Sequence, residues 1–332
     1  MSNLQIISAE EVTILVSLRD GEVKLGERVH TLDPAEWVES LKACPARFVL
    51  LGIPEDIGVR ANYGIGGTHT AWSDALKAIL NLQNTDSLSG DSLAILGSFN
   101  FSDWMKKADH MDIPSLRDTV SRIDEEVFHV VREIIAAGKV PIVIGGGHNN
   151  CYPLLKAAST ALGFPVNCIN LDPHSDFRAM EGRHSGNGFR YAKMEGYLRK
   201  YAIIGLHRNY NSQTVVEVLQ ADPDVQYSFY EEMFLHEKDR FYSTIEEAIR
   251  FTSGTPTGIE LDLDAIAGVL ASAATPSGVS SLQARQYVTW CAQLSTPAYL
   301  HLPEGIISRN DGRAAPSTGK LLAYLVSDFM RG

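Results

Sequence analysis

The stretch VNCINLDPHSD, residues 166–176, decides the fold class of this 332-residue chain. Its first six residues form a largely apolar run of the length of a β-strand, and its second half carries two aspartates and a histidine. Strands covered on both faces are apolar along most of their length, and they belong to parallel sheets flanked by helices. Polar groups directly after such a strand lie where open parallel sheets bind ligands. The stretch therefore predicts both an α/β architecture and a site.

Further apolar runs of the same kind lie on either side of this stretch, with helical segments between them. They cover residues 48–53, 93–97, 140–146, 202–206, 225–229, 258–263 and 298–302. The clearest helical segment is 118–139, in which apolar residues keep the spacing of one helix face and Gly138 marks the end. Strands that alternate with helices predict a mainly parallel sheet of about eight strands with helices on both faces.

The first forty-odd residues differ in pattern from the rest. Residues 12–32 alternate apolar and polar side chains around Asp20-Gly21, which predicts a β-hairpin. No repeat, low-complexity tract or long linker follows. We therefore expect residues 1–45 to form an N-terminal extension packed on one main domain, residues 46–332.

Composition excludes several classes of partner. The formal net charge of −11 disfavours nucleic acid and anionic membranes, and no apolar run approaches the length that spans a bilayer. The four cysteines are scattered, without metal-finger spacing, and are typical of reduced structural thiols. Residues 1–11 lack the pattern of a secretory signal. We expect a cytoplasmic protein.

Residues able to bind a metal follow four of the expected strands. They are His148 after 140–146; Asp172, His174 and Asp176 after 166–171; Asp262 and Asp264 at the end of 258–263; and Glu304 after 298–302. Carboxylates and neutral imidazoles together suit Mn²⁺, with zinc or iron as alternatives, and a site without sulfur does not resemble structural zinc. Clustered carboxylates repel each other unless cations neutralise them. A pair of divalent ions would resolve the repulsion and ionise a bound water near neutral pH.

Each motif has another interpretation when taken alone. The glycines before His148 could form a tight turn or a phosphate loop, although the Lys-Ser/Thr ending of a phosphate loop is missing. Residues 172–176 could form a surface turn, and Glu304 could be an exposed loop acid. It is the conjunction of these residues, each at the end of an expected strand, that favours a metal site.

The motifs GGGH (145–148), DPHSDFR (172–178), HSGNGF (184–189) and ELDLD (260–264) together resemble those of the ureohydrolase superfamily. This superfamily includes arginase, agmatinase and formimidoylglutamase. The resemblance runs from about residue 48 to residue 325, and it is closest to formimidoylglutamase. It implies a three-layer α/β/α arginase-like fold and a homo-oligomer.

The resemblance also implies two Mn²⁺ ions and their ligands. One ion would be held by His148, Asp172, Asp176 and Asp262, and the other by Asp172, His174, Asp262 and Asp264, so that Asp172 and Asp262 bridge. Asp176 would also orient the attacking hydroxide. Glu304 resembles the late family glutamate that pairs with a cationic amidine or guanidinium, although its context HLPEG differs from the usual E-x-N-P.

Two local features concern the substrate. Arg178 stands where formimidoylglutamases typically carry arginine; it suits a substrate carboxylate, or alternatively an ion pair with Glu181. The segment SGN resembles the arginase substrate loop, which implies that Ser185 and Asn187 bind substrate, while Asn187 could instead hold the loop. Against this, Ile65 stands where relatives often carry the arginine of G-R-x-G.

The hypothesis that follows is hydrolysis of N-formimidoyl-L-glutamate to L-glutamate and formamide, a step of histidine degradation. One alternative is an arginase- or agmatinase-like enzyme that releases urea from a guanidino compound. Another is a non-catalytic protein that has kept the fold. The partner expected in the first two cases is a small amidine or guanidine, not a nucleic acid or a membrane.

Overall fold

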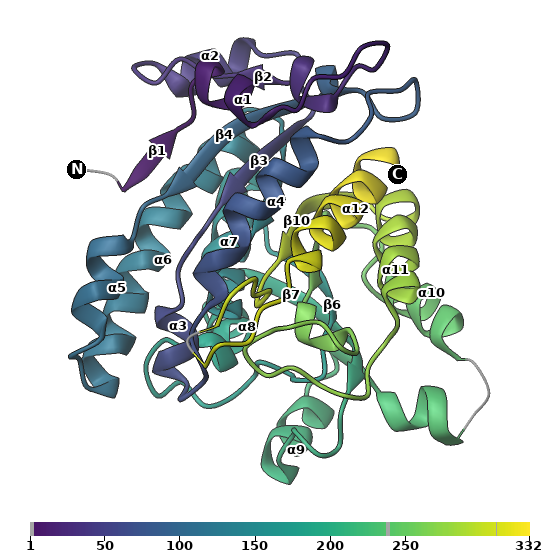
Figure 1. Cartoon of the computed structure of the whole chain (residues 1–332). Coiled ribbons are helices and arrows are strands. Elements are labelled where there is room, and N and C mark those ends of the chain that lie inside the picture. The colour runs from purple at the N-terminus through teal and green to yellow at the C-terminus, as the bar shows by residue number, and fades with distance from the viewer. Residues whose placement is uncertain (1–2, 237–239, 310) are drawn as a thin grey trace.

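The computed structural model describes residues 3–236, 240–309 and 311–332. Within these residues a ten-stranded sheet forms the middle layer (Figure 1). Its strands are β1 (Leu4–Ile6), β2 (His30–Thr31), β3 (Phe48–Gly52), β4 (Leu93–Phe99), β5 (Val140–Ile144), β6 (Val166–Leu171), β7 (Leu198–Leu206), β8 (Val225–Phe229), β9 (Thr257–Leu261) and β10 (Pro297–Leu302). They follow the order β1-β4-β3-β5-β10-β9-β6-β7-β8, and β2 pairs with β4. The pairing of β1 with β4 is antiparallel, and the other strand pairs are parallel.

Helices cover both faces of the sheet (Figure 1). They are α1 (Ala9–Leu15), α2 (Trp37–Ala43), α3 (Ile57–Ala61), α4 (Ala71–Leu80), α5 (Ser102–Ala108), α6 (Ile113–Ala136), α7 (Cys151–Leu162), α8 (Gly188–Met194), α9 (Gln213–Ala221), α10 (Phe241–Phe251), α11 (Ser281–Leu294) and α12 (Ser317–Arg331). One apolar core packs α4, α10, α11 and α12 on the sheet, and another packs α6, α7 and α8 on it. No helix within the described ranges is long and apolar enough to cross a membrane. The three-layer α/β/α prediction is confirmed.

All eight expected strands are present, as β3 to β10, but the prediction of about eight strands for the sheet was too low. The two additional strands, β1 and β2, have three and two residues. Such short strands carry too few side chains to show an alternating pattern. Both pair with β4, so the N-terminal segment extends the main sheet.

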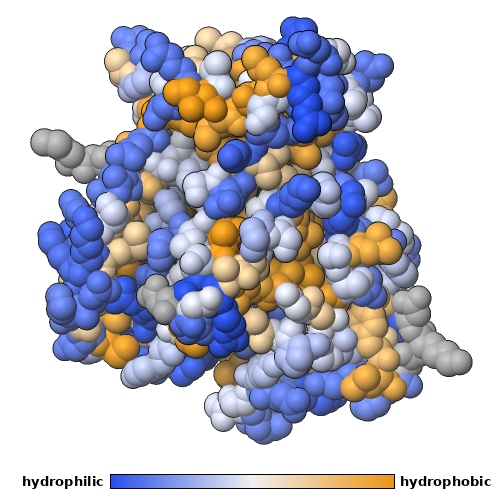
Figure 2. Space-filling view, viewed as in Figure 1, coloured by the Kyte–Doolittle hydropathy of each residue, from blue (hydrophilic) through white to orange (hydrophobic). Residues whose placement is uncertain are grey.

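The hairpin predicted for residues 12–32 is wrong. Helix α1 includes the beginning of this range, and Lys24 forms an antiparallel bridge with Gln83, outside the range. The signal for the helix was visible in the sequence, because Ser8 and Glu11 form a capping box. Figure 2 shows apolar patches among hydrophilic residues on the N-terminal segment at the top of this face.

Helix α6 begins five residues before the predicted position 118. The Asp112 side chain accepts a hydrogen bond from the Ser115 backbone at 3.0 Å, and Pro114 lies in the first turn. Both are ordinary helix-start signals. The predicted end is confirmed, since Gly138 follows the C-cap residue Ala137 with φ of 74°.

The four strands that carry the candidate ligands are neighbours at the centre of the sheet, in the order β5-β10-β9-β6. Their register aligns the ends of the strands: Leu302 pairs with Ile144, and Leu171 pairs with Leu261. The four loops that follow therefore leave the same edge of the sheet side by side.

Candidate metal centre

The loop after β5 turns sharply to bring His148 back over the sheet. Gly145 and Gly146 have φ values of 85° and 71°, a conformation that glycine adopts without strain. A Cβ on Gly146 would lie 2.3 Å from Nδ2 of Asn150, so a side chain is also excluded by space. The backbone N–H of Glu304 donates to the Gly146 carbonyl at 3.0 Å, which ties the β10 loop to the β5 loop.

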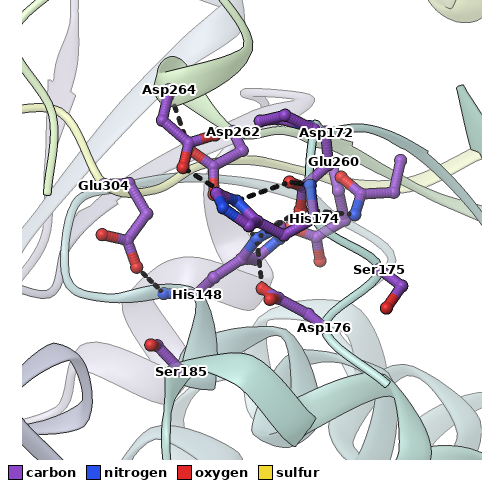
Figure 3. Close-up of polar contacts among 12 residues, drawn as sticks. His148, Asp172, His174, Ser175, Asp176, Ser185, Glu260, Asp262, Asp264 and Glu304 are labelled. Atoms are coloured by element: carbon purple, nitrogen blue, oxygen red, sulfur yellow. Dashed lines mark hydrogen bonds and ion pairs between the residues drawn. The ribbon is translucent and has the colours of Figure 1, made fainter. Parts of the chain in front are cut away.

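Three carboxylates converge on one ring nitrogen of His148 (Figure 3). Its Nδ1 lies 3.1 Å from Oδ2 of Asp172 and 3.0 Å from Oδ2 of both Asp176 and Asp262. The donor atoms of these four residues lie within 4.8 Å of one another, close enough to hold one metal ion.

A second group of ligand atoms forms around His174. Its Nδ1 lies 3.1 Å from Oδ2 of Asp264 and 3.6 Å from Oδ1 of Asp172. The donor atoms of these three residues also lie within 4.8 Å of one another. The structure thus brings together all six residues predicted as metal ligands, in two groups that share Asp172. Asp262 belongs to the first group.

Short backbone turns hold two of these carboxylates. Oδ1 of Asp172 accepts a hydrogen bond from the backbone N–H of His174 at 2.7 Å, and Oδ1 of Asp262 accepts one from the N–H of Asp264 at 2.8 Å. An aspartate that bonds to the N–H two residues later forms a local turn of its own. Asn170 donates to Oδ2 of Asp172 at 3.0 Å and fixes the orientation of that carboxylate.

Burial makes this concentration of charge costly. It raises the pKa of Asp262 well above its ordinary value, and the charges of Asp264 and Asp172 add to the effect. Burial likewise raises the pKa of Asp264 to about 6. Among the described residues, buried atoms without a hydrogen-bond partner include Nδ1 of His148, Oδ1 of Asp264 and Oε2 of Glu304. Oxygen and imidazole donors gathered in this way fit divalent cations, which would neutralise them.

Two site residues have strained backbones. Asp176 and Glu304 have φ values of 45° and 66°, and Tyr63 is the only other non-glycine residue with positive φ in the part of the chain that the structure describes. A non-glycine residue in this region costs about 1–3 kcal/mol, and such strain is concentrated at functional sites.

Glu304 is not an exposed loop acid. It is 3% exposed, and its Oε1 accepts a hydrogen bond from the backbone N–H of His148 at 2.8 Å (Figure 3). Burial, reinforced by the charge of Asp262, raises the pKa of Glu304 to about 8. Its Oε2 is the atom left without a partner, and Glu304 lines the cavity beside the metal groups.

A cavity of about 570 Å³ opens onto both groups of candidate metal ligands. Arg178 lies on its wall with 52% of the side chain exposed; Nη1 donates to Oδ1 of Asn62 at 3.3 Å, and Nη2 lies 3.7 Å from Oε1 of Glu181. The same Glu181 oxygen accepts a shorter hydrogen bond, 3.0 Å, from Arg117. Glu181 therefore pairs more closely with Arg117 and leaves Arg178 available.

The two predicted residues of the substrate loop lie in different surroundings. Ser185 lines the cavity, and its hydroxyl accepts from Nδ2 of Asn62 at 3.3 Å. Asn187 is fully buried and is absent from the described cavity lining. Its Oδ1 accepts a hydrogen bond from Arg183 at 2.7 Å, and its Nδ2 donates one to the Gly182 carbonyl at 2.8 Å. In this structure Asn187 holds the loop.

Sequence reasoning missed several residues around the site. Arg183 is buried in an ion pair with Asp124 at 2.9 Å. Arg190 lines the cavity but was not singled out. The motif at 260–264 gave Glu260 no role, although a glutamate inside an apolar strand is itself a signal, because such a charge needs a partner.

Known proteins resemble the chain over most of its length. A profile of the arginase family matches residues 46–298. Formimidoylglutamase from Geobacillus thermodenitrificans (strain NG80-2) is 28% identical over 275 residues, which cover 80% of this chain and 78% of that protein. Formimidoylglutamase from Aromatoleum aromaticum is 26% identical over 242 residues, covering 68% and 66%.

Two solved structures show the same fold. Formimidoylglutamase from Bacillus subtilis superimposes with a TM-score of 0.76 at 18% identity, covering 95% of this chain and 93% of that chain. Trypanosoma cruzi formiminoglutamase with Mn²⁺ gives a TM-score of 0.73 at 19% identity, covering 93% and 97%. The predicted resemblance to ureohydrolases is confirmed, and the chain belongs to the arginase family.

Proposed function

We propose that this protein is a hydrolase that holds two Mn²⁺ ions and cleaves a C–N bond of a linear amidine. The substrate we propose is N-formimidoyl-L-glutamate, which with water gives L-glutamate and formamide. The observation that carries the proposal is the pair of ligand groups sharing Asp172, next to a cavity that is also lined by Glu304, whose Oε2 has no hydrogen-bond partner. The formimidoylglutamases among the relatives support it.

The ligands would be shared between the two ions as the family resemblance implies. His148, Asp172, Asp176 and Asp262 would hold one, and Asp172, His174, Asp262 and Asp264 the other. When bound, the ions supply positive charge that polarises the substrate and lowers the pKa of water.

Asp176 orients the attacking water. It lines the cavity, and its left-handed backbone places one carboxylate oxygen, Oδ2, 3.0 Å from Nδ1 of His148. Its other oxygen, Oδ1, accepts a hydrogen bond from the water and aims it at the amidine carbon. A positioned carboxylate of this kind acts by fixing geometry and by accepting the proton.

Glu304 binds the amidine. Its Oε1 is occupied by the His148 backbone, which leaves Oε2 for a charge-assisted hydrogen bond from an amidine nitrogen. A cationic amidinium favours the ionised form of Glu304, against the effect of burial that raises its pKa to about 8. The amidine is thereby held with its planar carbon toward the ligand groups.

Two arginines on the cavity wall suit the carboxylates of formimidoylglutamate. Arg178 is half exposed and only weakly paired with Glu181. For Arg190, no hydrogen bond or ion pair occurs with any residue that the structure describes; its guanidinium lies 6.0 Å from the Phe177 ring centroid. Two cations near the entrance attract a dicarboxylate and repel the free ammonium group of agmatine.

A side-by-side assay tests the proposal. Purified protein loaded with Mn²⁺ is given N-formimidoylglutamate, arginine, agmatine and guanidinobutyrate, and formamide and urea are measured separately. Formamide from the first substrate supports the proposal. Urea from a guanidino substrate would show that the proposed substrate is wrong and that the protein is still a hydrolase. No product from any of the four substrates would favour the non-catalytic alternative. Cytoplasmic location and self-association remain predictions from the sequence.

A further inference from the structure

A buried glutamate–histidine pair lies directly behind the metal ligand groups. Glu260 of β9 and His301 of β10 are register partners, and both side chains are fully buried. Oε2 of Glu260 lies 2.6 Å from Nδ1 of His301. Placing a carboxylate in a sheet flanked by apolar cores is costly unless its partners compensate for the lost water. The contacts of Glu260 and His301 must therefore compensate for their burial.

Both oxygens of Glu260 have partners. The Tyr299 hydroxyl donates to Oε1 at 2.8 Å. Besides His301, Oε2 faces the ring of His148, 3.4 Å from its Nε2. The His148 ring thus lies between Glu260 on its Nε2 side and the carboxylates of Asp172, Asp176 and Asp262 on its Nδ1 side (Figure 3).

This arrangement determines which nitrogen of His148 can bind a metal. A neutral imidazole carries one proton, so a ring that binds a metal through Nδ1 must carry its proton on Nε2. A carboxylate next to Nε2 favours that tautomer, fixes the ring orientation and increases the electron density on the metal-binding nitrogen. Glu260 is the described carboxylate nearest to Nε2 of His148.

We propose that Glu260 is a positioning residue for metal binding: it holds His148 in the Nε2-protonated form, and His301 and Tyr299 hold Glu260 in place. The inference rests on the proposed function only in requiring a divalent ion at Nδ1 of His148. It does not depend on the substrate.

These residues could instead be taken as a separate metal group, since donor atoms of His148, Glu260 and His301 lie within 4.8 Å of one another. The contacts disfavour that interpretation. His148 would have to bind ions through both ring nitrogens and lose its remaining proton, and Glu260 already contacts Tyr299 and His301.

The test is the Mn²⁺ affinity of Glu260→Gln, measured by isothermal titration calorimetry on protein stripped of metal, with bound metal counted by mass spectrometry. Loss of such a partner typically weakens metal binding by about 10- to 100-fold. We expect a loss in this range for one of the two ions, with a smaller change for the other. Glu260→Gln that folds and binds both ions with wild-type affinity would overturn the inference.

Two further variants make the result decisive. Asp328→Asn removes the charge of a largely buried carboxylate on α12, paired with Arg285 at 2.6 Å, and we expect it to leave both Mn²⁺ affinities unchanged. If Glu260→Gln does not fold, Tyr299→Phe replaces it, because it removes only the hydroxyl that holds Glu260. A weaker affinity for one ion then supports the inference, and no change contradicts it.

Different results would contradict the role of Glu260 and the proposed function. Wild-type protein that binds two Mn²⁺ ions but hydrolyses none of the four substrates defeats the proposed function and leaves the role of Glu260 intact. Unchanged Mn²⁺ affinity in Glu260→Gln defeats the role of Glu260 and leaves the hydrolase intact.

Discussion

Nδ1 of His148 lies 3.0 Å from Oδ2 of Asp262, although the two residues follow strands β5 and β9, which are separated in the sheet by β10. The contact exists because parallel strands end at one edge and the loop after β5 turns back over it. Asp262 is 2% exposed, so little bulk water reaches its charge. A carboxylate and an imidazole buried this deeply need compensating charge, and a divalent ion bound by both would supply it.

Asp172 belongs to both candidate ligand groups. Asp172→Ala should abolish the binding of two ions, since both groups lose a donor, whereas Asp264→Ala should leave the His148 group with its four donors. Counting bound Mn²⁺ by mass spectrometry after dialysis measures the difference. Two tightly bound ions in Asp172→Ala would show that the ligand assignment is wrong.

Arg190→Gln should raise the KM for N-formimidoylglutamate by about 10- to 100-fold with little change in kcat. The reason is that a hydrogen bond to a charged partner contributes about 1.5–3 kcal/mol, and Arg190 would act on a carboxylate remote from the reacting carbon. Arg178→Gln should have an effect in the same direction. Arg313→Gln, on an exposed side chain paired with Asp311, is the matched control and should leave KM unchanged. A wild-type KM in Arg190→Gln would remove Arg190 from the substrate site.

Arg183→Ala should lower the free energy of unfolding by about 3–5 kcal/mol, because it leaves the buried Asp124 carboxylate without its ion partner. Arg183 also donates to Oδ1 of Asn187 at 2.7 Å and to the Asn149 carbonyl at 2.8 Å, so the substrate loop and the His148 loop both lose a contact. Urea denaturation measures the loss. The double variant Asp124→Leu/Arg183→Met should recover part of it, and a double variant as unstable as Arg183→Ala would contradict this explanation.

The pKa of His184 predicts a loss of stability in mild acid. Burial, together with the nearby charges of Arg117 and Arg178, lowers it from 6.5 to about 4. The folded state therefore disfavours the protonated ring, and the unfolded chain binds a proton that the folded chain does not between these two pH values. The stabilisation is complete above pH 6.5 and is lost as the pH falls toward 4, by on the order of 3 kcal/mol.

His184→Asn isolates this contribution. Nδ1 of His184 accepts a hydrogen bond from the Gly186 backbone at 3.1 Å, and an asparagine oxygen can accept the same bond without titrating. The free energy of unfolding of this variant should fall less steeply between pH 6.5 and pH 4 than that of the wild type. Equal slopes would mean that His184 has an ordinary pKa in the folded protein.

The sequence indicated the candidate metal ligands because each follows an apolar strand, a local pattern that needs no knowledge of the partner strands. It could not predict that β10 lies between β5 and β9, because strand order depends on pairings between distant segments. The direction of the Asn187 side chain was equally hidden, since the bond from Arg183 exists only in the folded loop. The hairpin predicted from alternation over residues 12–32 was wrong. The capping box formed by Ser8 and Glu11 was the better local signal, since it marks the start of a helix.

The central claim is that these side chains hold two divalent ions, and anomalous diffraction from crystals grown with Mn²⁺ tests it most directly. We predict two anomalous peaks, one among the donor atoms of His148, Asp172, Asp176 and Asp262 and one among those of Asp172, His174, Asp262 and Asp264, with Asp172 and Asp262 next to both. A map with no peak in either group, or with peaks only elsewhere on the protein, would contradict the claim.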